Sequence, residues 1–252
     1  MHVIAGKILK NKFLLFSVAV NIGLLLAFIF VFSELKKVYT HYRHYRVLQI
    51  GTSQATSVTA PLDDNTIVLF GDSRIGTWYP DLVSDRFTFI NAGVAGETTV
   101  EMKRRFQQDV LRLQPEYVLI QAGRNVLTAS VTKGMEQPEK RLQEMHSNLE
   151  FFISSLEQQG IDVIVTSIIP NSRLNLFRRQ FWFNTLDDKV RKANSKLQQT
   201  TLQAGAEWVD LDPLFLDEHG NPVKELYFDA LHINDEGYVV LNSHLQEYLQ
   251  QL

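Results

Sequence analysis

The stretch Thr66-Ile-Val-Leu-Phe-Gly-Asp-Ser-Arg74 joins a short apolar run to a polar turn. Consecutive β-branched and aromatic residues followed by Gly and Asp are typical of a buried β-strand that ends in a tight turn. The pattern predicts that the hydroxyl of Ser73 lies at the carboxyl end of a buried strand. A serine in such a turn is most often a cap or turn residue, so a chemical role needs a second observation.

A second motif, near the C-terminus, supplies what a reactive serine needs. Asp229-Ala230-Leu231-His232 places an acid and a base three positions apart. A serine becomes a nucleophile when a base takes its proton, and that base needs a partner that orients it. Ser73, Asp229 and His232 together therefore predict a serine hydrolase.

Short apolar runs alternate with long amphipathic segments from residue 66 onward. The predicted strands are Thr66–Phe70, Phe87–Ile90, Tyr117–Ile120, Ile161–Val165 and Ala206–Val209. Apolar residues repeat at helical spacing within 102–113, 142–156, 186–197 and 238–249. Strands that alternate with helices require crossover connections, so the sequence predicts a three-layer α/β/α domain with a parallel five-stranded sheet.

Ligands of such sheets bind beyond the carboxyl ends of the strands. Ser73, the turn from Gly93 to Gly96, the segment from Gly123 to Asn125 and Ile169-Pro170 all follow predicted strand ends. We expect them to converge on one rim of the sheet.

Four short motifs together resemble those of the GDSL or SGNH hydrolase superfamily. In chain order they are Gly71-Asp72-Ser73-Arg74 with Gly76, Asn91-Ala-Gly-Val-Ala-Gly-Glu-Thr-Thr99, Gly123-Arg124-Asn125 and Asp229-Ala230-Leu231-His232. Each motif alone is weak, but their order, spacing and placement after strands are specific. The match spans residue 66 to the C-terminus. The resemblance implies a flavodoxin-like sheet and the activity of a serine esterase or lipase.

By that resemblance, Ser73 is the nucleophile, His232 the general base and Asp229 the residue that orients the imidazole. The resemblance also implies an oxyanion hole formed by the backbone N–H groups of Ser73 and Gly96 and by the side chain of Asn125. Glycine permits close backbone approach, and a carboxamide donates hydrogen bonds without adding charge, which agrees with these roles. The implied chemistry uses no cofactor and no metal, and the sequence shows no metal-ligand cluster.

Two positions depart from the family pattern. Arg74 stands where the family name has leucine, and Val126 stands where aspartate commonly follows the third-motif asparagine. The first departure leaves the nucleophile intact. The second removes a carboxylate that would support Asn125.

Four residues are predicted to bind substrate. Arg74 and Arg124 flank proposed catalytic residues, while Phe181 and Trp182 belong to an aromatic and arginine-rich stretch, 174–183, after the fourth strand. Arginines suit an anionic or sugar substrate, and aromatic rings stack on sugars or hold an acyl chain. The alternative is that the arginines form structural ion pairs and the aromatic residues pack in the core.

The composition excludes several other classes of protein. The formal net charge is −3 and the charges are interspersed, which argues against a nucleic-acid partner. The chain has no cysteine, so disulfides, thiolate metal sites and a cysteine nucleophile are excluded.

The N-terminal region predicts a membrane anchor. Residues 13–32 carry no charge, over about the length that a helix needs to cross the hydrocarbon core. A cleaved signal peptide would have a shorter apolar core and a cleavage site of small residues, which 33–36 do not offer. The expected organisation is a basic tail over 1–12, a transmembrane helix over 13–32, a juxtamembrane segment and linker over 33–61, and the catalytic domain over 62–252.

The orientation of that anchor follows from its flanks only in part. Lysine and arginine residues lie on both sides of the span, so the positive-inside rule gives little direction. A short basic tail before a single span usually stays in the cytoplasm. We therefore expect a single-pass membrane protein whose catalytic domain is extracytoplasmic, or periplasmic in a Gram-negative bacterium.

These observations predict a membrane-anchored serine hydrolase that acts through an acyl-serine intermediate. The expected substrates are small-molecule or glycan esters with short O-acyl or O-acetyl groups. Three alternatives stay open: a lysophospholipase or other lipid esterase, an O-acyltransferase of envelope glycans, and a non-catalytic envelope scaffold. The sequence does not identify a protein partner.

Overall fold

The computed structural model describes residues 2–45, 54–59, 62, 65–78, 84–174, 176–183 and 185–252. The chain divides into two compact units, Met1–Arg43 and His44–Leu252. The first unit consists of most of helix α1 (His2–Tyr45). The second unit holds the sheet and all the predicted site residues.

Helix α1 contains the expected membrane span. Its stretch Leu14–Lys36 is long and apolar enough to cross a membrane, and none of it is buried inside the protein. Phe16, Leu25 and Phe30 are each more than half exposed. A helix that is apolar all round and unburied suits a hydrocarbon environment better than water, so α1 could be a transmembrane helix. The helix also takes in the predicted basic tail and the first part of the juxtamembrane segment.

The second unit is built on a five-stranded sheet of order β2-β1-β3-β4-β5, parallel throughout. The strands are β1 (Thr66–Gly71), β2 (Thr88–Gly93), β3 (Tyr117–Gln121), β4 (Asp162–Thr166) and β5 (Glu207–Val209). All five predicted strands are confirmed with small shifts at their ends. β1 and β3 are buried along their whole length, which explains their continuous apolar sequences. The strand order is the flavodoxin-like one.

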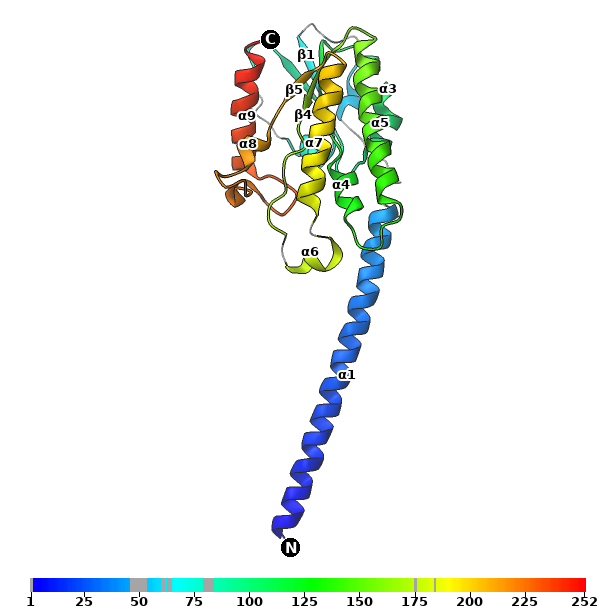
Figure 1. Cartoon of the computed structure of the whole chain (residues 1–252), viewed down its shortest axis with the longest axis vertical. Helices are drawn as coiled ribbons and strands as arrows, with labels where there is room; N and C mark the ends of the chain where they lie inside the picture. The colour runs from blue at the N-terminus through cyan, green and yellow to red at the C-terminus, as the bar shows by residue number, and fades with distance from the viewer. Residues whose placement is uncertain are drawn as a thin grey trace. The chain divides into compact units, whose positions relative to one another are not determined.

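Helices cover both faces of the sheet (Figure 1). On one face lie α3 (Thr99–Asp109), α5 (Pro138–Glu157) and α7 (Leu186–Gln203), and on the other lie α8 (Asp212–Phe215) and α9 (Asp235–Leu249). The four amphipathic segments are therefore helical as expected, although 102–113 divides into α3 and a 3-10 turn, η3 (Leu111–Leu113). The three-layer α/β/α architecture is confirmed.

Several short elements were not predicted. They are the helices α2 (Ser73–Gly76), α4 (Arg124–Ser130), α6 (Leu176–Phe181) and α8, and the 3-10 turns η2 (Gln54–Ser57) and η4 (Lys224–Leu226). Helices α2 and α4 begin immediately after β1 and β3, at the rim where the site was expected.

Two apolar cores fill the spaces between the layers. Phe70, Phe106 and Phe152 are mutually in contact, with ring centroids 4.9 to 5.6 Å apart, between the sheet and the α3–α5 layer. The opposite core joins strand residues to α9 and includes Ile67, Leu69, Trp78, Tyr238, Leu241 and Leu245. Both cores pack against β1, so the strand that leads to Ser73 is fixed from both sides.

The segment before β1 is part of the domain rather than a free tether. Ala55 is fully buried, and the Arg112 guanidinium donates to the carbonyl oxygens of Ala55 (3.4 Å) and Val58 (3.0 Å). Residues 54–58, which belong to the predicted linker, thus pack on the second unit. Residues 46–53 of the predicted linker lie outside the described residues.

Candidate active site

Ser73 begins helix α2, directly beyond the end of β1. Asp72 caps this helix, since its Oδ1 accepts a hydrogen bond from the Arg74 backbone N–H at 3.1 Å. As the first residue of the helix, Ser73 has a backbone N–H with no acceptor inside the helix. Ser73 is 9% exposed. A hydroxyl and a free N–H are thereby presented together at the rim.

Gly93 allows α2 to lie against the end of β2. A Cβ at this position would stand 2.1 Å from the backbone N of Gly76 and 2.5 Å from the carbonyl carbon of Ile75. No real side chain tolerates such contacts, so only glycine fits. The first glycine of the second motif therefore lets the helix that begins with Ser73 pack against the sheet.

Asp229 and His232 form a tight turn that orients the imidazole. Asp229 Oδ1 accepts from the backbone N–H groups of Leu231 (2.7 Å) and His232 (2.8 Å), and lies 3.1 Å from His232 Nδ1. With Nδ1 donating to the carboxylate, Nε2 is left as the base. Burial opposes ionisation of Asp229, but the hydrogen bonds from the His232 ring and from the two backbone N–H groups hold its pKa below the ordinary value.

Arg74 joins the two halves of the site. Its guanidinium donates to the carbonyl oxygens of Leu231 (2.7 and 3.0 Å), Ile169 (2.7 Å) and Pro170 (3.2 Å). One side chain thus ties the helix of Ser73 to the loop of His232. Arg74 is 2% exposed, and burial lowers the pKa of its guanidinium. This geometry differs from the substrate contact expected for Arg74, because carbonyls of the protein occupy its donors.

Ser73 and His232 consequently lie at the same rim of the sheet. Within the part of the chain that the structure describes, no hydrogen bond joins the Ser73 hydroxyl to the imidazole. Catalytic hydrogen bonds are often long before substrate binds and shorten in the Michaelis complex. The structure thus pairs Asp229 with His232 and joins their loop to the helix of Ser73 through Arg74, while the role of the three residues as a triad stays a prediction.

The second and third motifs are joined by a hydrogen bond. Gly96 adopts a positive φ of 84°, a conformation suited to glycine, and is followed by Glu97. Asn125, the second residue of α4, donates from Nδ2 to the Glu97 carbonyl oxygen at 2.8 Å. This bond uses one of the two Nδ2 hydrogens, and the predicted oxyanion role of Asn125 would need the other. The main-chain carbonyl of Glu97 gives Asn125 a support that the missing aspartate at Val126 would otherwise provide.

Arg105 is a buried organiser of this rim that the sequence did not single out. Its guanidinium donates to the carbonyl oxygens of Gly71 (3.1 Å) and Ala92 (2.8 Å), and pairs with Glu97 Oε2 at 2.7 Å. These contacts join the carboxyl ends of β1 and β2 to the loop that holds Asn125. The one sequence signal for burial of Arg105 was its position on the same helix face as the apolar residues of the α3 segment.

Arg124 is the least satisfied charge at the site. It is 3% exposed, and among the described residues none of its three guanidinium nitrogens has a hydrogen-bond partner. Burial lowers its pKa to about 9, and repulsion from Arg74 adds to the shift. A buried, unpaired guanidinium costs free energy, so Arg124 is a group that a partner would stabilise. Its role in substrate binding stays a prediction.

Phe181 and Trp182 attach the α6 segment to the chain that leaves α4. Both residues are almost fully buried. The Lys133 N–H donates to the Phe181 carbonyl at 2.7 Å, and Trp182 forms an antiparallel bridge with Thr132. Their burial favours the packing alternative over the open aromatic platforms that the sequence suggested.

Arg178 contacts the proposed catalytic acid, and sequence reasoning missed it. Its Nη2 lies 2.8 Å from Asp229 Oδ2, the oxygen that does not face His232. The stretch 174–183 was expected to meet substrate, but nothing in the sequence indicates which of its arginines pairs with Asp229.

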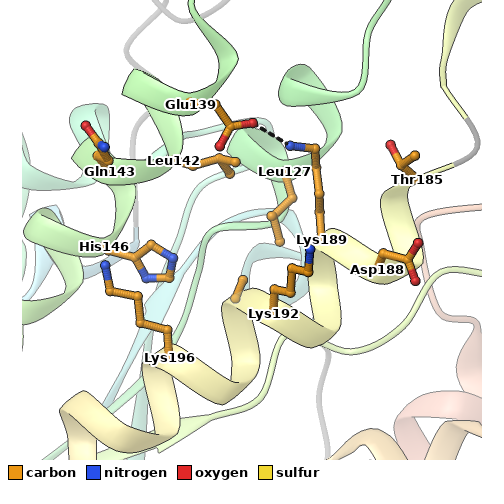
Figure 2. Close-up of a pocket in the computed structure, with 11 residues that line it drawn as sticks. Leu127, Glu139, Leu142, Gln143, His146, Thr185, Asp188, Lys189, Lys192 and Lys196 are labelled. Carbon is orange, nitrogen blue, oxygen red and sulfur yellow. Dashed lines mark hydrogen bonds and ion pairs between the residues drawn. The ribbon is translucent and has the colours of Figure 1, made fainter.

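A separate hollow of about 500 Å³ lies between α5 and α7 (Figure 2). Leu127 and Leu142 contribute apolar lining, and Lys192, Lys196 and His146 contribute basic side chains. Burial lowers the pKa of His146 to about 4, with a smaller contribution from Lys196, so its imidazole is neutral at pH 7. None of the predicted site residues is among the residues that line this hollow.

Sequence comparison places the chain among known proteins. A model of the GDSL-like Lipase/Acylhydrolase family matches residues 51–240. The uncharacterized lipoprotein YqeF of Bacillus subtilis is 30% identical over 141 residues, a match that covers 49% of this chain and 57% of that protein. The chain therefore matches little more than half the length of this curated relative.

Solved structures share the fold. A GDSL-like lipase from Bacteroides thetaiotaomicron has a TM-score of 0.65 at 20% identity, with 84% of this chain and 98% of that chain covered. The acetylxylan esterase Axe2 of Geobacillus stearothermophilus has a TM-score of 0.58 at 14% identity, with coverages of 73% and 93%. At these identities the likeness shows the fold and leaves the substrate open.

Proposed function

The chain belongs to the GDSL-like lipase/acylhydrolase family, and from that premise we propose that it hydrolyses short-chain O-acyl esters through an acyl-serine intermediate. One observation carries the proposal: Asp229 holds His232 at 3.1 Å in a loop that Arg74 ties to the helix of Ser73. A carboxylate–imidazole pair beside a serine is the arrangement that acyl transfer to serine requires.

In the proposed reaction, His232 Nε2 takes the proton of the Ser73 hydroxyl while Oγ attacks the ester carbonyl carbon. Asp229 stabilises the imidazolium that forms. The oxyanion accepts hydrogen bonds from the N–H groups of Ser73 and Gly96 and from Asn125 Nδ2. His232 then passes the proton to the departing alkoxide. Water, activated by the same imidazole, hydrolyses the acyl-serine and restores the hydroxyl.

We propose that the acyl group is small. Phe181 and Trp182 would have been the natural walls of a wide groove, but both are packed inside the protein. On p-nitrophenyl esters, kcat/KM should therefore fall once the acyl chain exceeds about four carbons, with octanoate roughly tenfold or more below acetate. Initial rates across the series, with the Ser73→Ala protein as the background control, measure this. A best substrate of eight or more carbons would favour the lipid-ester alternative instead.

Glycan esters are the substrate class that we propose first. The acetylxylan esterase that shares the fold acts, by its name, on an acetylated glycan. The same acyl-serine can pass its acyl group to a sugar hydroxyl instead of water. Product analysis with and without a glycan acceptor separates hydrolysis from transfer: free acetate indicates an esterase, and an acetylated acceptor indicates an O-acyltransferase.

We also propose that α1 anchors the protein in a membrane with the second unit on the extracytoplasmic side. The unburied apolar stretch Leu14–Lys36 supports the anchor, and a relative named a lipoprotein agrees with an envelope location. The full chain should stay in the membrane fraction after carbonate extraction. A C-terminal alkaline phosphatase fusion should be active and a matched C-terminal green fluorescent protein fusion dark. The reverse pattern would show a cytoplasmic second unit.

A further inference from the structure

The two oxygens of the Asp229 carboxylate have different partners. Oδ1 receives all three hydrogen bonds of its own turn, from the backbone of Leu231 and from the backbone and ring of His232. Oδ2 faces away from that turn and pairs with Arg178 Nη2 at 2.8 Å. The second oxygen of the proposed catalytic acid is therefore paired with a cation that lies 51 residues away in the chain.

Helix α6, which carries Arg178, is fastened to the opposite side of the site. The Lys133 N–H donates to the Phe181 carbonyl at 2.7 Å, and the Phe183 N–H donates to the Val131 carbonyl at 2.8 Å. Val131 directly follows α4, the helix whose second residue is the proposed oxyanion donor Asn125. The α6 segment thus spans from the oxyanion side to the acid.

The Arg178 side chain is confined in this position. Its guanidinium carbon lies 5.3 Å from the centroid of the Trp182 ring, and the ring itself is buried. The side chain of Arg178 is 24% exposed and that of Asp229 is 30% exposed. Stacking on a fixed aromatic ring reduces the freedom that an exposed arginine would lose on pairing, so this ion pair is better organised than a surface one.

We propose that Arg178 is a positioning residue of the triad, which holds the Asp229 carboxylate ionised against His232 and makes the seating of α6 a condition for full activity. The inference rests on the proposed roles of Ser73, Asp229 and His232. Under this proposal Arg178, in the arginine-rich stretch 174–183, supports a catalytic residue and does not bind substrate.

Charge is the main means by which Arg178 acts. The two backbone N–H groups would still orient Asp229 without it, but the carboxylate would lose its one ion pair from another element. Three other charged groups belong to the surroundings of the Asp229–His232 pair: Asp72 at the start of α2, Arg74 on the Leu231 carbonyl and Arg178 itself. Removing the Arg178 charge makes a proton bind more readily at this site, because a nearby positive charge no longer repels it.

The sign of the pH effect follows from this. A pair that binds its proton more readily needs a higher pH to become the active base. The acid limb of kcat/KM should therefore move to higher pH in Arg178→Ala, by about 0.5 to 1 unit for a partly exposed pair. At pH 6 the rate should fall roughly three- to tenfold, mainly in kcat, because no substrate contact is lost.

Full-length protein in detergent, assayed with p-nitrophenyl acetate from pH 5 to 9, tests the proposal. Arg178→Lys keeps a cation and should keep the acid limb near that of the wild type, whereas Arg178→Ala should shift it. Arg179→Ala is the matched control, because the Arg179 guanidinium donates to the Leu174 carbonyl at 3.2 Å and not to Asp229. Superimposable acid limbs for wild type and Arg178→Ala, or an equal shift in Arg179→Ala, would overturn the proposal.

A second measurement separates this inference from the proposed function. If the wild type hydrolyses no ester, the proposed function fails, and carbon-13 NMR of the Asp229 carboxyl then decides the role of Arg178. Its pKa should rise in Arg178→Ala relative to wild type and change little in Arg178→Lys. An Asp229 that titrates identically in all three proteins means that Arg178 does not hold the carboxylate.

Discussion

The Ser73→Ala protein is expected to turn over esters at least about 10³-fold more slowly than the wild type while folding normally. The loss is large because the hydroxyl forms the covalent bond to the acyl group, and no neighbouring group replaces it. The fold should survive because, in the described part of the chain, the Ser73 hydroxyl makes no hydrogen bond whose loss would leave a buried partner. His232→Ala should lose a similar factor and Asp229→Ala less, since the carboxylate orients and stabilises the base without reacting itself.

Steady-state rates on p-nitrophenyl acetate, with thermal unfolding as the fold check, measure this loss. A fluorophosphonate should add its mass to Ser73 in the wild type and leave Ser73→Ala unlabelled. Lys192→Ala, which alters the hollow between α5 and α7, is the distant control and should match the wild type. Wild-type rates in Ser73→Ala would place the nucleophile elsewhere. A wild type that is inactive and is not labelled at Ser73 would instead support the non-catalytic alternative.

The sheet could be predicted from sequence because its strands are buried on both faces. β1 and β3 are buried throughout, so each is a run of apolar residues bounded by polar ones, and the long helices between them carry clear apolar stripes. Helices α2 and α4 gave no such signal. Each has fewer than eight residues, too few for the apolar period to emerge, and the chain enters them through Gly-Asp and Gly-Arg turns.

The motifs that hold Ser73 and the Asp229–His232 pair could be recognised because each is a run of only four consecutive residues. The partners of those motifs could not. Asp229 meets Arg178 across 51 residues of chain, and only the phase of α6 decides that Arg178 and not Arg179 faces the carboxylate. Arg105 was hidden for a similar reason: the carbonyls of Gly71 and Ala92 become its acceptors only once β1 and β2 lie side by side. Such contacts depend on tertiary packing, which local patterns do not encode.

Arg74 illustrates how burial changes the interpretation of a charged residue. Beside a reactive serine, an arginine in the sequence suits an anionic substrate. In the structure the loops that carry Ile169 and Leu231 close over it, and their carbonyls take its donors. A substrate role and a structural role for Arg74 predict different effects of its substitution on KM and on Tm, so a variant can distinguish them.

Arg74→Ala is expected to lower both stability and turnover. The carbonyl oxygens of Ile169, Pro170 and Leu231 would lose their donor, and a buried acceptor left without a partner costs about 1–3 kcal/mol. Some relaxation will occur, so we expect a net loss of about 3–5 kcal/mol, of the order measured when buried charged networks are broken. For a domain of this size that corresponds to a fall in Tm of roughly 10 °C. Well below that Tm, kcat should drop about 10²-fold, because small displacements of catalytic groups cost this much.

The division between kcat and KM decides between the two roles of Arg74. If Arg74 positions the loop of His232 against the helix of Ser73, kcat falls, Tm falls and KM stays nearly constant. If Arg74 binds substrate, KM rises for charged esters and Tm hardly changes. Arg74→Lys should lie between wild type and alanine, since a single ammonium cannot reproduce the planar set of donors that reaches three carbonyl groups. A variant with unchanged Tm and a raised KM would show that Arg74 binds substrate. Contacts other than those of Arg74 would then have to hold the loop of His232 against the helix of Ser73.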